Sequence, residues 1–330
     1  YGGGSDGSLY IDDSDPTITS STFRYSATSG IYSNNARPTI TNTSIVDNDA
    51  FGVECTGGLC LDETTGSFAN NTVSGNGNYP LSLYAPTVAS LDSTSTYSGN
   101  DYDSIRIRGG TVSADASWQA LDIPYFADEN IYVQHTTLDP TLTLQDGVEL
   151  YFDSAKGFYV GTSYPGNLVV EGTSSGVFMT SAAATPATGD WSGLYLGRYA
   201  DATTVLEGLT VDYAGYGGNA SAIYLYVNQN QSVSITDSTI QNSSTSGITI
   251  MDGARPTITG TVIRDNGGYG IWTNSGNALG GDFTNNTVTG NGAHPLYLYA
   301  AAIYRLDSSS SYTGNGNDTI LLRDSTVSSS

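Results

Sequence analysis

The sequence of 330 residues predicts an all-β solenoid with essentially no α-helix. Its apolar runs are short, as at residues 39–40, 44–46, 51–53 and 81–84, and turns rich in Asn, Asp and Gly separate them. This is the pattern of strands, and no segment keeps a helical period over a useful length. The runs recur in coils of roughly 20–28 residues, a spacing within the range of solenoid repeats. We therefore expect each coil to pair with its neighbours.

The chain also repeats itself over a long distance. Residues 68–113 begin FANNTVSGNGNYPLSLYA, and residues 283–328 begin FTNNTVTGNGAHPLYLYA, at an offset of 215 (283 − 68 = 215). Upstream, ARPTIT at residues 36–41 returns at residues 254–259 with an offset of 218 (254 − 36 = 218). Self-similarity of this length is typical of a repeat architecture.

The repeat divides the chain into two copies. Tyr1-Gly2-Gly3 returns at residues 216–218, so residues 1–215 are predicted to be a first long unit. Residues 216–330 would be the first half of a second copy, continuous with the first in one solenoid. Neither end resembles the atypical capping segment of a solenoid, which predicts a longer repeat protein.

The charge balance limits the classes of partner. The chain has 32 Asp and Glu against 10 Lys and Arg, a net charge of −22. Nucleic acids and anionic membranes attract basic surfaces, so neither is expected as a partner. No apolar run is long enough to span a bilayer, and no membrane insertion is expected.

Cys55 and Cys60 are the two cysteines, and a local disulfide between them is the favoured interpretation. The two histidines, His135 and His294, are far away in sequence, which disfavours a zinc site. A disulfide favours an oxidising compartment. The matching loop of the second copy, residues 272–279, contains no cysteine, so this disulfide would belong to one loop only.

Several segments resemble a known family. RPTITNTSIVDNDAFGV, RPTITGTVIRDNGGYGI and NNTVSGN resemble coils of the right-handed parallel β-helix proteins of the pectate-lyase-like type. LTLQDGVELYF at residues 142–152 and GDWSGL at residues 189–194 resemble a unit of large bacterial surface β-helix proteins. The resemblance implies a right-handed parallel β-helix, a fold that carries lyases, hydrolases, adhesins and inert stalks.

The catalytic pattern of the family's enzymes is incomplete. Those enzymes use an Arg or Lys base with Asp ligands for calcium, or paired Asp residues for hydrolysis. Arg106 and Arg108 in SIRIRGG are similar to the RIK element of polygalacturonases, but the adjacent Asp pair and the GHG element are missing. Asp12 and Asp13 adjoin one another and align with non-acidic residues of the second copy. We therefore assign no catalytic, cofactor-binding or metal-binding residue and predict that the protein is not an enzyme.

Some polar residues occur in both copies, and positions retained in this way are more often turn and register residues than catalytic ones. The matched pairs are Asp47-Asn48 with Asp265-Asn266, Asp92 with Asp307, Asp103 with Asp318, Arg108 with Arg323, and Asn71 with Asn286. The histidines are not matched, because His294 aligns with Tyr79.

Three ligand hypotheses remain open. Asp101 and Asp103 in GNDYDS could bind calcium, although a solvated turn is favoured over a bare D-x-D site. Tyrosines could form a sugar-binding stripe, or they could stack inside or along the solenoid; these are Tyr84 and Tyr299, Tyr97 and Tyr312. Sequons permit glycosylation at Asn42, Asn242 and Asn317.

The sequence thus predicts an extracellular or cell-surface structural repeat protein that forms a filament, stalk or adhesin. Its expected partners are further repeats of the same chain or other copies bound end to end, with glycans as a further candidate. Coils pair about 4.8 Å apart, so a unit of roughly nine coils would rise on the order of 45 Å. The alternative is a polysaccharide-binding or polysaccharide-cleaving β-helix protein.

Overall fold

The computed structural model describes residues 6–58, 60–200, 202–217, 221–228, 233–274 and 279–323. Over these residues the chain forms 34 short strands and two 3-10 helices, with no α-helix among them. This confirms the predicted all-β class. The Tyr1-Gly2-Gly3 segment and the end of the repeat at residues 324–328 lie outside the described residues.

The chain folds as two compact units. Unit 1 comprises Tyr1–Thr111, Ala116–Glu129 and Val148–Leu150, and unit 2 comprises the remaining residues. The predicted copy boundary at residues 215–216 lies inside unit 2. Strand β23 (Leu209–Asp212) before it pairs in parallel with β26 (Thr239–Gln241) after it, so the pairing of coils continues across the boundary.

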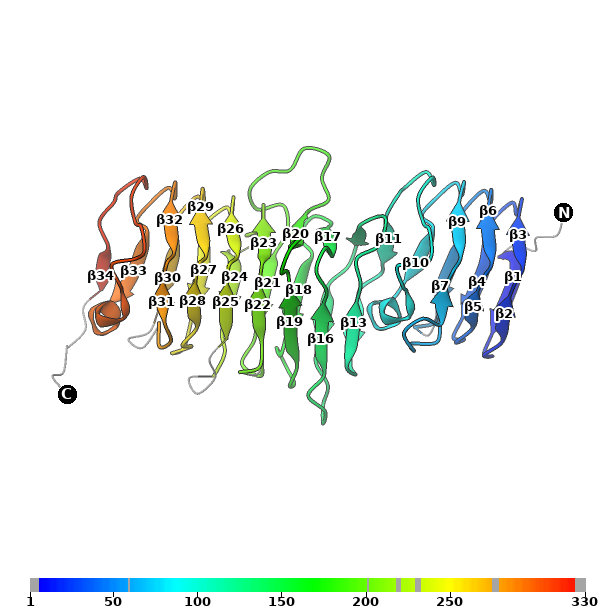
Figure 1. The fold of residues 1–330 in the computed structure, drawn as a ribbon, viewed down its shortest axis with the longest axis horizontal. Coiled ribbons are helices and arrows are strands. Elements are labelled where there is room, and N and C mark those ends of the chain that lie inside the picture. Colours follow the sequence, from blue (N-terminus) through cyan, green and yellow to red (C-terminus); the bar gives the residue numbers. More distant parts are fainter. Residues whose placement is uncertain are drawn as a thin grey trace. The chain divides into compact units, whose positions relative to one another are not determined.

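Within unit 1, strands of successive coils lie side by side in parallel sheets (Figure 1). The first sheet has the order β1 (Gly7–Asp12), β4 (Ser29–Asn34), β7 (Val53–Thr56), β10 (Leu81–Leu83), β11 (Ile105–Ile107) and β14 (Tyr125–Ala127). The second contains β2 (Thr17–Thr19), β5 (Thr39–Thr41) and β8 (Phe68–Ala69), and the third contains β3 (Thr22–Arg24), β6 (Ser44–Val46) and β9 (Thr72–Ser74). Unit 1 also holds β13 (Ala116–Trp118) and the 3-10 helix η1 (Ala85–Ser90). Strands β12 (Gly110–Val112) and β17 (Glu149–Phe152) contain points where the chain passes from one unit to the other.

Within unit 2, successive coils likewise contribute strands to three parallel sheets (Figure 1). One has the order β16 (Thr141–Leu144), β19 (Asn167–Glu171), β22 (Val205–Glu207), β25 (Ser234–Thr236), β28 (Thr257–Thr259) and β31 (Phe283–Thr284). The next has the order β20 (Val177–Ser181), β23, β26, β29 (Val262–Arg264) and β32 (Thr287–Thr289). The last has the order β15 (Ile131–Val133), β18 (Gly157–Val160), β21 (Gly193–Leu196), β24 (Ser221–Leu225), β27 (Ser246–Ile250), β30 (Ile271–Thr273), β33 (Leu296–Tyr299) and β34 (Leu321–Arg323). The 3-10 helix η2 (Ala300–Arg305) follows β33.

The core of each unit is built from like residues stacked in register. In β5 the side chain of Ile40 points inward and is fully buried, while Thr39 and Thr41 face outward, as the two-residue period of a strand requires. Ile40 pairs with Ile18 in the previous coil and with Phe68 in the next. Burial of one such side chain contributes about 1.5–3 kcal/mol, so the stacked core supplies the main stabilisation.

The two sequence copies build the same local elements. Strand β28 and helix η2 of the second copy stand at the positions of β5 and η1 in the first. Both helices start after a tyrosine in extended conformation and end before a leucine that donates its backbone N–H to the helix. No helix in the described part of the chain is long and apolar enough to cross a membrane.

Candidate functional site

A ladder of asparagine side chains links successive turns of unit 1. Asn48 donates its Nδ2–H to Oδ1 of Asn76 over 2.8 Å, and Asn76 donates in the same way to Oδ1 of Asn100 over 2.8 Å. The second Nδ2–H of Asn76 is donated to the carbonyl of Ile45 over 3.2 Å. Asn48 and Asn76 are 1% exposed, so these bonds are shielded from water. Each side chain joins its own coil to the next.

Unit 2 contains the same ladder. Asn266 donates to Oδ1 of Asn291 over 2.9 Å, and Asn291 donates to Oδ1 of Asn315 over 2.9 Å. In both units, the residue before each ladder asparagine has a left-handed backbone, for example Asp47 at φ 54° and Gly75 at φ 68°. Asn, Asp and Gly tolerate this conformation best. The sequence signal is therefore an Asp-Asn or Gly-Asn pair recurring once per coil.

Asn71 and its counterpart in the second copy, Asn286, each form another contact between neighbouring coils. Oδ1 of Asn71 accepts the backbone N–H of Thr43 over 2.9 Å, and its Nδ2 donates to the carbonyl of Ile40 over 2.8 Å. Asn286 repeats both bonds, with Thr261 over 3.0 Å and Ile258 over 2.8 Å. Each asparagine thus satisfies a buried backbone N–H just after a turn and also bonds to a carbonyl within a strand of the neighbouring coil.

The matched aspartates cap turns within their own coils. Asp103 accepts the N–H of Asn100 over 2.8 Å, and Asp318 accepts that of Asn315 over 2.7 Å. Bonds from backbone N–H groups, foremost that of Asn315, lower the pKa of Asp318. Asp92 accepts the N–H of Thr94 over 3.1 Å, and Asp307 occupies the same place in the second copy. These carboxylates therefore accept hydrogen bonds from backbone N–H groups within turns.

The acidic and basic residues that resemble catalytic elements are also engaged in structural contacts. Asp12 accepts the Nδ2–H of Asn34 over 2.7 Å. Arg106 forms an ion pair with Asp128, its Nη2 lying 2.5 Å from Oδ2. Arg108 donates Nη1–H to the carbonyl of Cys55 over 2.6 Å. Its guanidinium also lies over the ring of Tyr84, at 5.2 Å from the centroid.

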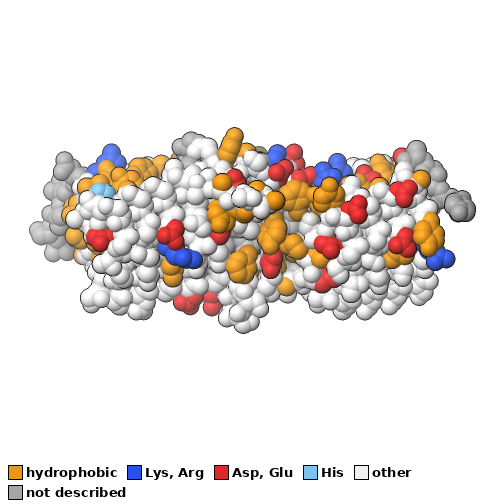
Figure 2. Space-filling view, turned by 90° about the horizontal axis from the view of Figure 1, so that it is seen from above, with side chains coloured by type: hydrophobic (Ala, Val, Ile, Leu, Met, Phe, Trp, Pro, Cys, Tyr) orange, Lys and Arg blue, Asp and Glu red, His pale blue; other side chains and the backbone are white. Residues whose placement is uncertain are grey.

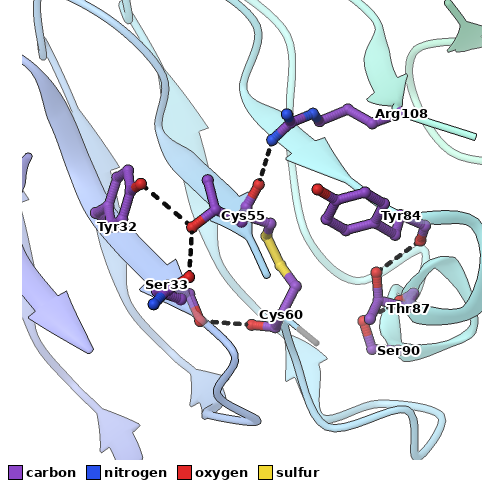
Figure 3. Close-up of a disulfide and its surroundings, with 10 residues drawn as sticks. Tyr32, Ser33, Cys55, Cys60, Tyr84, Thr87, Ser90 and Arg108 are labelled. Atoms are coloured by element: carbon purple, nitrogen blue, oxygen red, sulfur yellow. Dashed lines mark hydrogen bonds between the residues drawn. A yellow bond between two sulfur atoms is a disulfide. The ribbon is translucent and has the colours of Figure 1, made fainter. Parts of the chain in front are cut away.

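The structure joins Cys55 and Cys60 in a disulfide with a Cα–Cα distance of 5.1 Å, within the usual range (Figure 3). Both cysteines are fully buried. Ser33 donates Oγ–H to the carbonyl of Cys60 over 2.9 Å, and Arg108 binds the carbonyl of Cys55 (Figure 3). The disulfide loop is thus attached to the preceding coil through Ser33 and to the coil of β11, two coils further on, through Arg108.

Replacing both Cys55 and Cys60 with serine is expected to destabilise unit 1. The bond closes a loop of sequence separation 5. By the loop-entropy relation, its loss costs about 2 kcal/mol. Urea denaturation with and without reductant measures the change, and the doubly substituted protein should not respond to reductant. Alkylation of both cysteines in the unreduced, denatured wild-type protein would show that the bond is not formed.

The two histidines occupy separate turns. His135 Nδ1 accepts the backbone N–H of Leu138 over 3.0 Å. His294 contacts the carbonyl of Thr319 and stacks on Tyr269. Asp101 is exposed and donates its backbone N–H to the carbonyl of Asn76 over 3.0 Å. Over the described ranges, no three His, Cys, Asp or Glu side chains are grouped to hold a metal ion.

A ladder of four tyrosines follows one sheet of unit 2. Tyr132, Tyr159, Tyr195 and Tyr224 are register partners on β15, β18, β21 and β24. Their ring centroids are separated by 5.2, 6.0 and 4.9 Å in turn, and all four are half-buried. Burial, followed by the neighbouring Tyr224, raises the pKa of Tyr195 to about 12. We call these residues the tyrosine ladder.

The tyrosines proposed from the sequence do not form this stripe. Tyr97 is fully buried and stacks on Phe68, and burial raises the pKa of its phenol. Tyr84 and Tyr299 instead lie under Arg108 and Arg323. The signal for the tyrosine ladder is a tyrosine between two aliphatic or aromatic residues, as in IYV at residues 131–133 and LYL at residues 194–196.

The three sequons differ in accessibility. Asn42 and Asn317 are exposed. Asn242 is half-buried, and its Nδ2 donates to Asp212 over 2.8 Å. The face in Figure 2 consists largely of uncharged polar side chains and backbone, with hydrophobic and acidic side chains scattered among them.

Comparison with known proteins identifies the family. The model described as the right handed beta helix region matches residues 1–120 and 216–326. No curated protein and no solved structure matches the chain. The two matched segments cover more than half of the chain, and they begin at the starts of the two sequence copies. The chain belongs to the right-handed parallel β-helix family.

Proposed function

We propose that this chain is a structural segment of an extracellular repeat protein that serves as a filament, stalk or adhesin. One observation carries the proposal: residues that recur in both copies make the same internal bonds in each. The asparagine ladders repeat at Asn76 and Asn291, and the turn caps repeat at Asp103 and Asp318. Selection of the sequence for coil stacking accounts for this pattern, because nearest-neighbour contacts determine the stability of a solenoid.

Electron microscopy of the native material at its natural length tests the structural role. Long fibres with an axial repeat on the order of 45 Å, from roughly nine coils at the strand spacing, are the expected result. Discrete short particles without such a repeat would contradict the filament form of the proposal. Immunolabelling of intact cells tests the surface location in the same preparation.

The tyrosine ladder supports a second candidate function, the binding of a polysaccharide. Half-exposed aromatic rings in a row offer apolar faces on which sugar rings can stack. Affinity electrophoresis in gels containing neutral and acidic polysaccharides tests this function. Tyr159→Ala should abolish retardation, and Tyr216→Ala should not, since Tyr216 is 54% exposed and lies outside the ladder. Equal retardation of all three proteins would exclude the ladder as the binding surface.

A further inference from the structure

A small cavity of unit 2 gathers positive charge in a strongly acidic protein. It has a volume of about 60 Å³ and lies beside η2. Its lining includes Arg255 and Arg305, together with Gly280, Ala302 and Tyr304. The chain has only 10 Lys and Arg residues and a net charge of −22. Two guanidinium groups at one cavity are therefore a local reversal of the protein's charge.

The first copy lacks this arrangement. At the offset of 218, Arg255 and Gly280 correspond to Arg37 and Asp62, since 255 − 37 = 218 and 280 − 62 = 218. There, hydrogen bonds from Thr64 and then the charge of Arg37 lower the pKa of the Asp62 carboxyl. The carboxylate is thus balanced by an arginine in the first copy, and glycine replaces it in the second.

Two further replacements change the charge in the same direction. Gly281 stands where the first copy has Glu63, since 281 − 63 = 218, and Arg305 stands where it has Ser90, since 305 − 90 = 215. Ser90 is buried and donates Oγ–H to the carbonyl of Thr87 over 2.7 Å. Counting these positions with the arginine common to both copies, the local charge changes from −1 to +2.

The local packing keeps both arginines at the cavity. A Cβ at Gly280 would collide with the side chain of Arg255, so the absence of a side chain there makes room for it. The guanidinium of Arg305 lies over the ring of Tyr304, 4.7 Å from its centroid. Nε of Arg305 is buried and has no hydrogen-bond partner. A buried donor without a partner is destabilising, and an oxyanion would satisfy it through a charge-assisted bond.

The nearby carboxylates do not line the cavity. Asp307 accepts bonds from Ser309 and Ser310 at the turn after η2. Asp282 is exposed at the start of β31. A guanidinium has five N–H donors, so Arg255 can hold an oxyanion in addition to other partners. We propose that this cavity, the Arg255–Arg305 cavity, binds a small oxyanion such as sulfate or phosphate, either free or as a substituent of a polymer.

Calorimetric titration with sodium sulfate at low ionic strength tests the proposal, with sodium chloride at equal ionic strength as the reference. We expect one sulfate site per chain, and Arg305→Ser, which introduces the residue of the first copy, should weaken it about tenfold or more. Arg305→Gln retains a polar side chain but removes the charge, and it should weaken binding similarly. Arg264→Ser is the matched control, because Arg264 is exposed and pairs with Asp265 outside the cavity.

Two results would overturn the inference: no sulfate binding by the wild-type protein, or an equal loss with Arg264→Ser. A parallel titration with dextran sulfate at equal sulfate concentration, with dextran as the blank, separates the two sources. Tighter binding of the polymer, lost with Arg305→Ser, assigns a polymer substituent, and equal binding assigns the free ion. Far-ultraviolet circular dichroism confirms that each variant is folded. Fibre formation is measured separately, so this outcome is independent of the proposed structural role.

Discussion

Replacing Asn76 with alanine is expected to destabilise unit 1 by about 3 kcal/mol. Asn76 is buried in the middle of the asparagine ladder and bonds to Asn48, Asn100 and the carbonyl of Ile45. Its removal takes away the acceptor of both the backbone N–H and one Nδ2–H of the buried Asn48, and each unsatisfied buried group costs about 1–3 kcal/mol. Urea denaturation followed by circular dichroism measures the loss.

Two variants define the specificity of this effect. Asn78→Ala should cost less than about 1 kcal/mol, because Asn78 is half-buried and its Oδ1 accepts the N–H of the adjacent Tyr79, not a bond from another coil. Asn291→Ala should match Asn76→Ala, since Asn291 makes the same bonds in unit 2. Hydrogen exchange should accelerate in the coils beside the substituted residue and not in the other unit. Similar effects of Asn76→Ala and Asn78→Ala would contradict a stabilising role of the ladder.

The strands were predictable because each depends on a few neighbouring residues. In residues 39–41, a single inward isoleucine between two threonines specifies a short strand, and the structure has β5 there. The long repeat also showed which residues of the two copies are equivalent, because they recur at an offset of 215 or 218. The parallel pairing followed from the resemblance to β-helix coils, which specifies how successive coils stack.

The asparagine ladders were only half visible in the sequence. Asn48, Asn71 and Asn286 were interpreted as turn residues, and they do lie next to left-handed turn positions. What the sequence left open is the direction of each side chain, because a turn asparagine can face water or bond to the neighbouring coil. Coil lengths vary, so Asn48 and Asn76 are 28 residues apart while Asn76 and Asn100 are 24 apart. Only the three-dimensional register places them in one row.

The tyrosine ladder was missed for a similar reason. The sequence drew attention to tyrosines that recur in both copies, such as Tyr97 and Tyr312, and these stack on Phe68 and Phe283. Three of the ladder tyrosines, Tyr132, Tyr159 and Tyr195, instead lie in coils that are not repeated within the chain. Their alignment depends on the pairing of β15, β18, β21 and β24, and a shift of one residue would have turned them inward.

Replacing Gly208 with alanine is expected to destabilise unit 2 by more than about 3 kcal/mol, as two effects add. Gly208 has φ +60°, a left-handed backbone that costs a residue with a Cβ about 1–2 kcal/mol. In addition, the new Cβ would collide with the carbonyl oxygen of Gly172 in the neighbouring coil. Gly208 also donates its N–H to Thr236 and accepts that of Val177, so its backbone cannot move without breaking coil pairing.

Gly217→Ala separates the two effects. Gly217 has φ +93°, and a Cβ there would meet nothing within 4 Å, so its substitution should cost only the backbone penalty of about 1–2 kcal/mol. Urea denaturation followed by tryptophan fluorescence, to which the fully buried Trp191 of unit 2 contributes, compares the variants. A larger loss for Gly208→Ala means that the close approach of neighbouring backbones limits which residues a coil accepts. Equal losses would mean that the coils can separate to admit a methyl group, and that the turn conformation alone requires glycine.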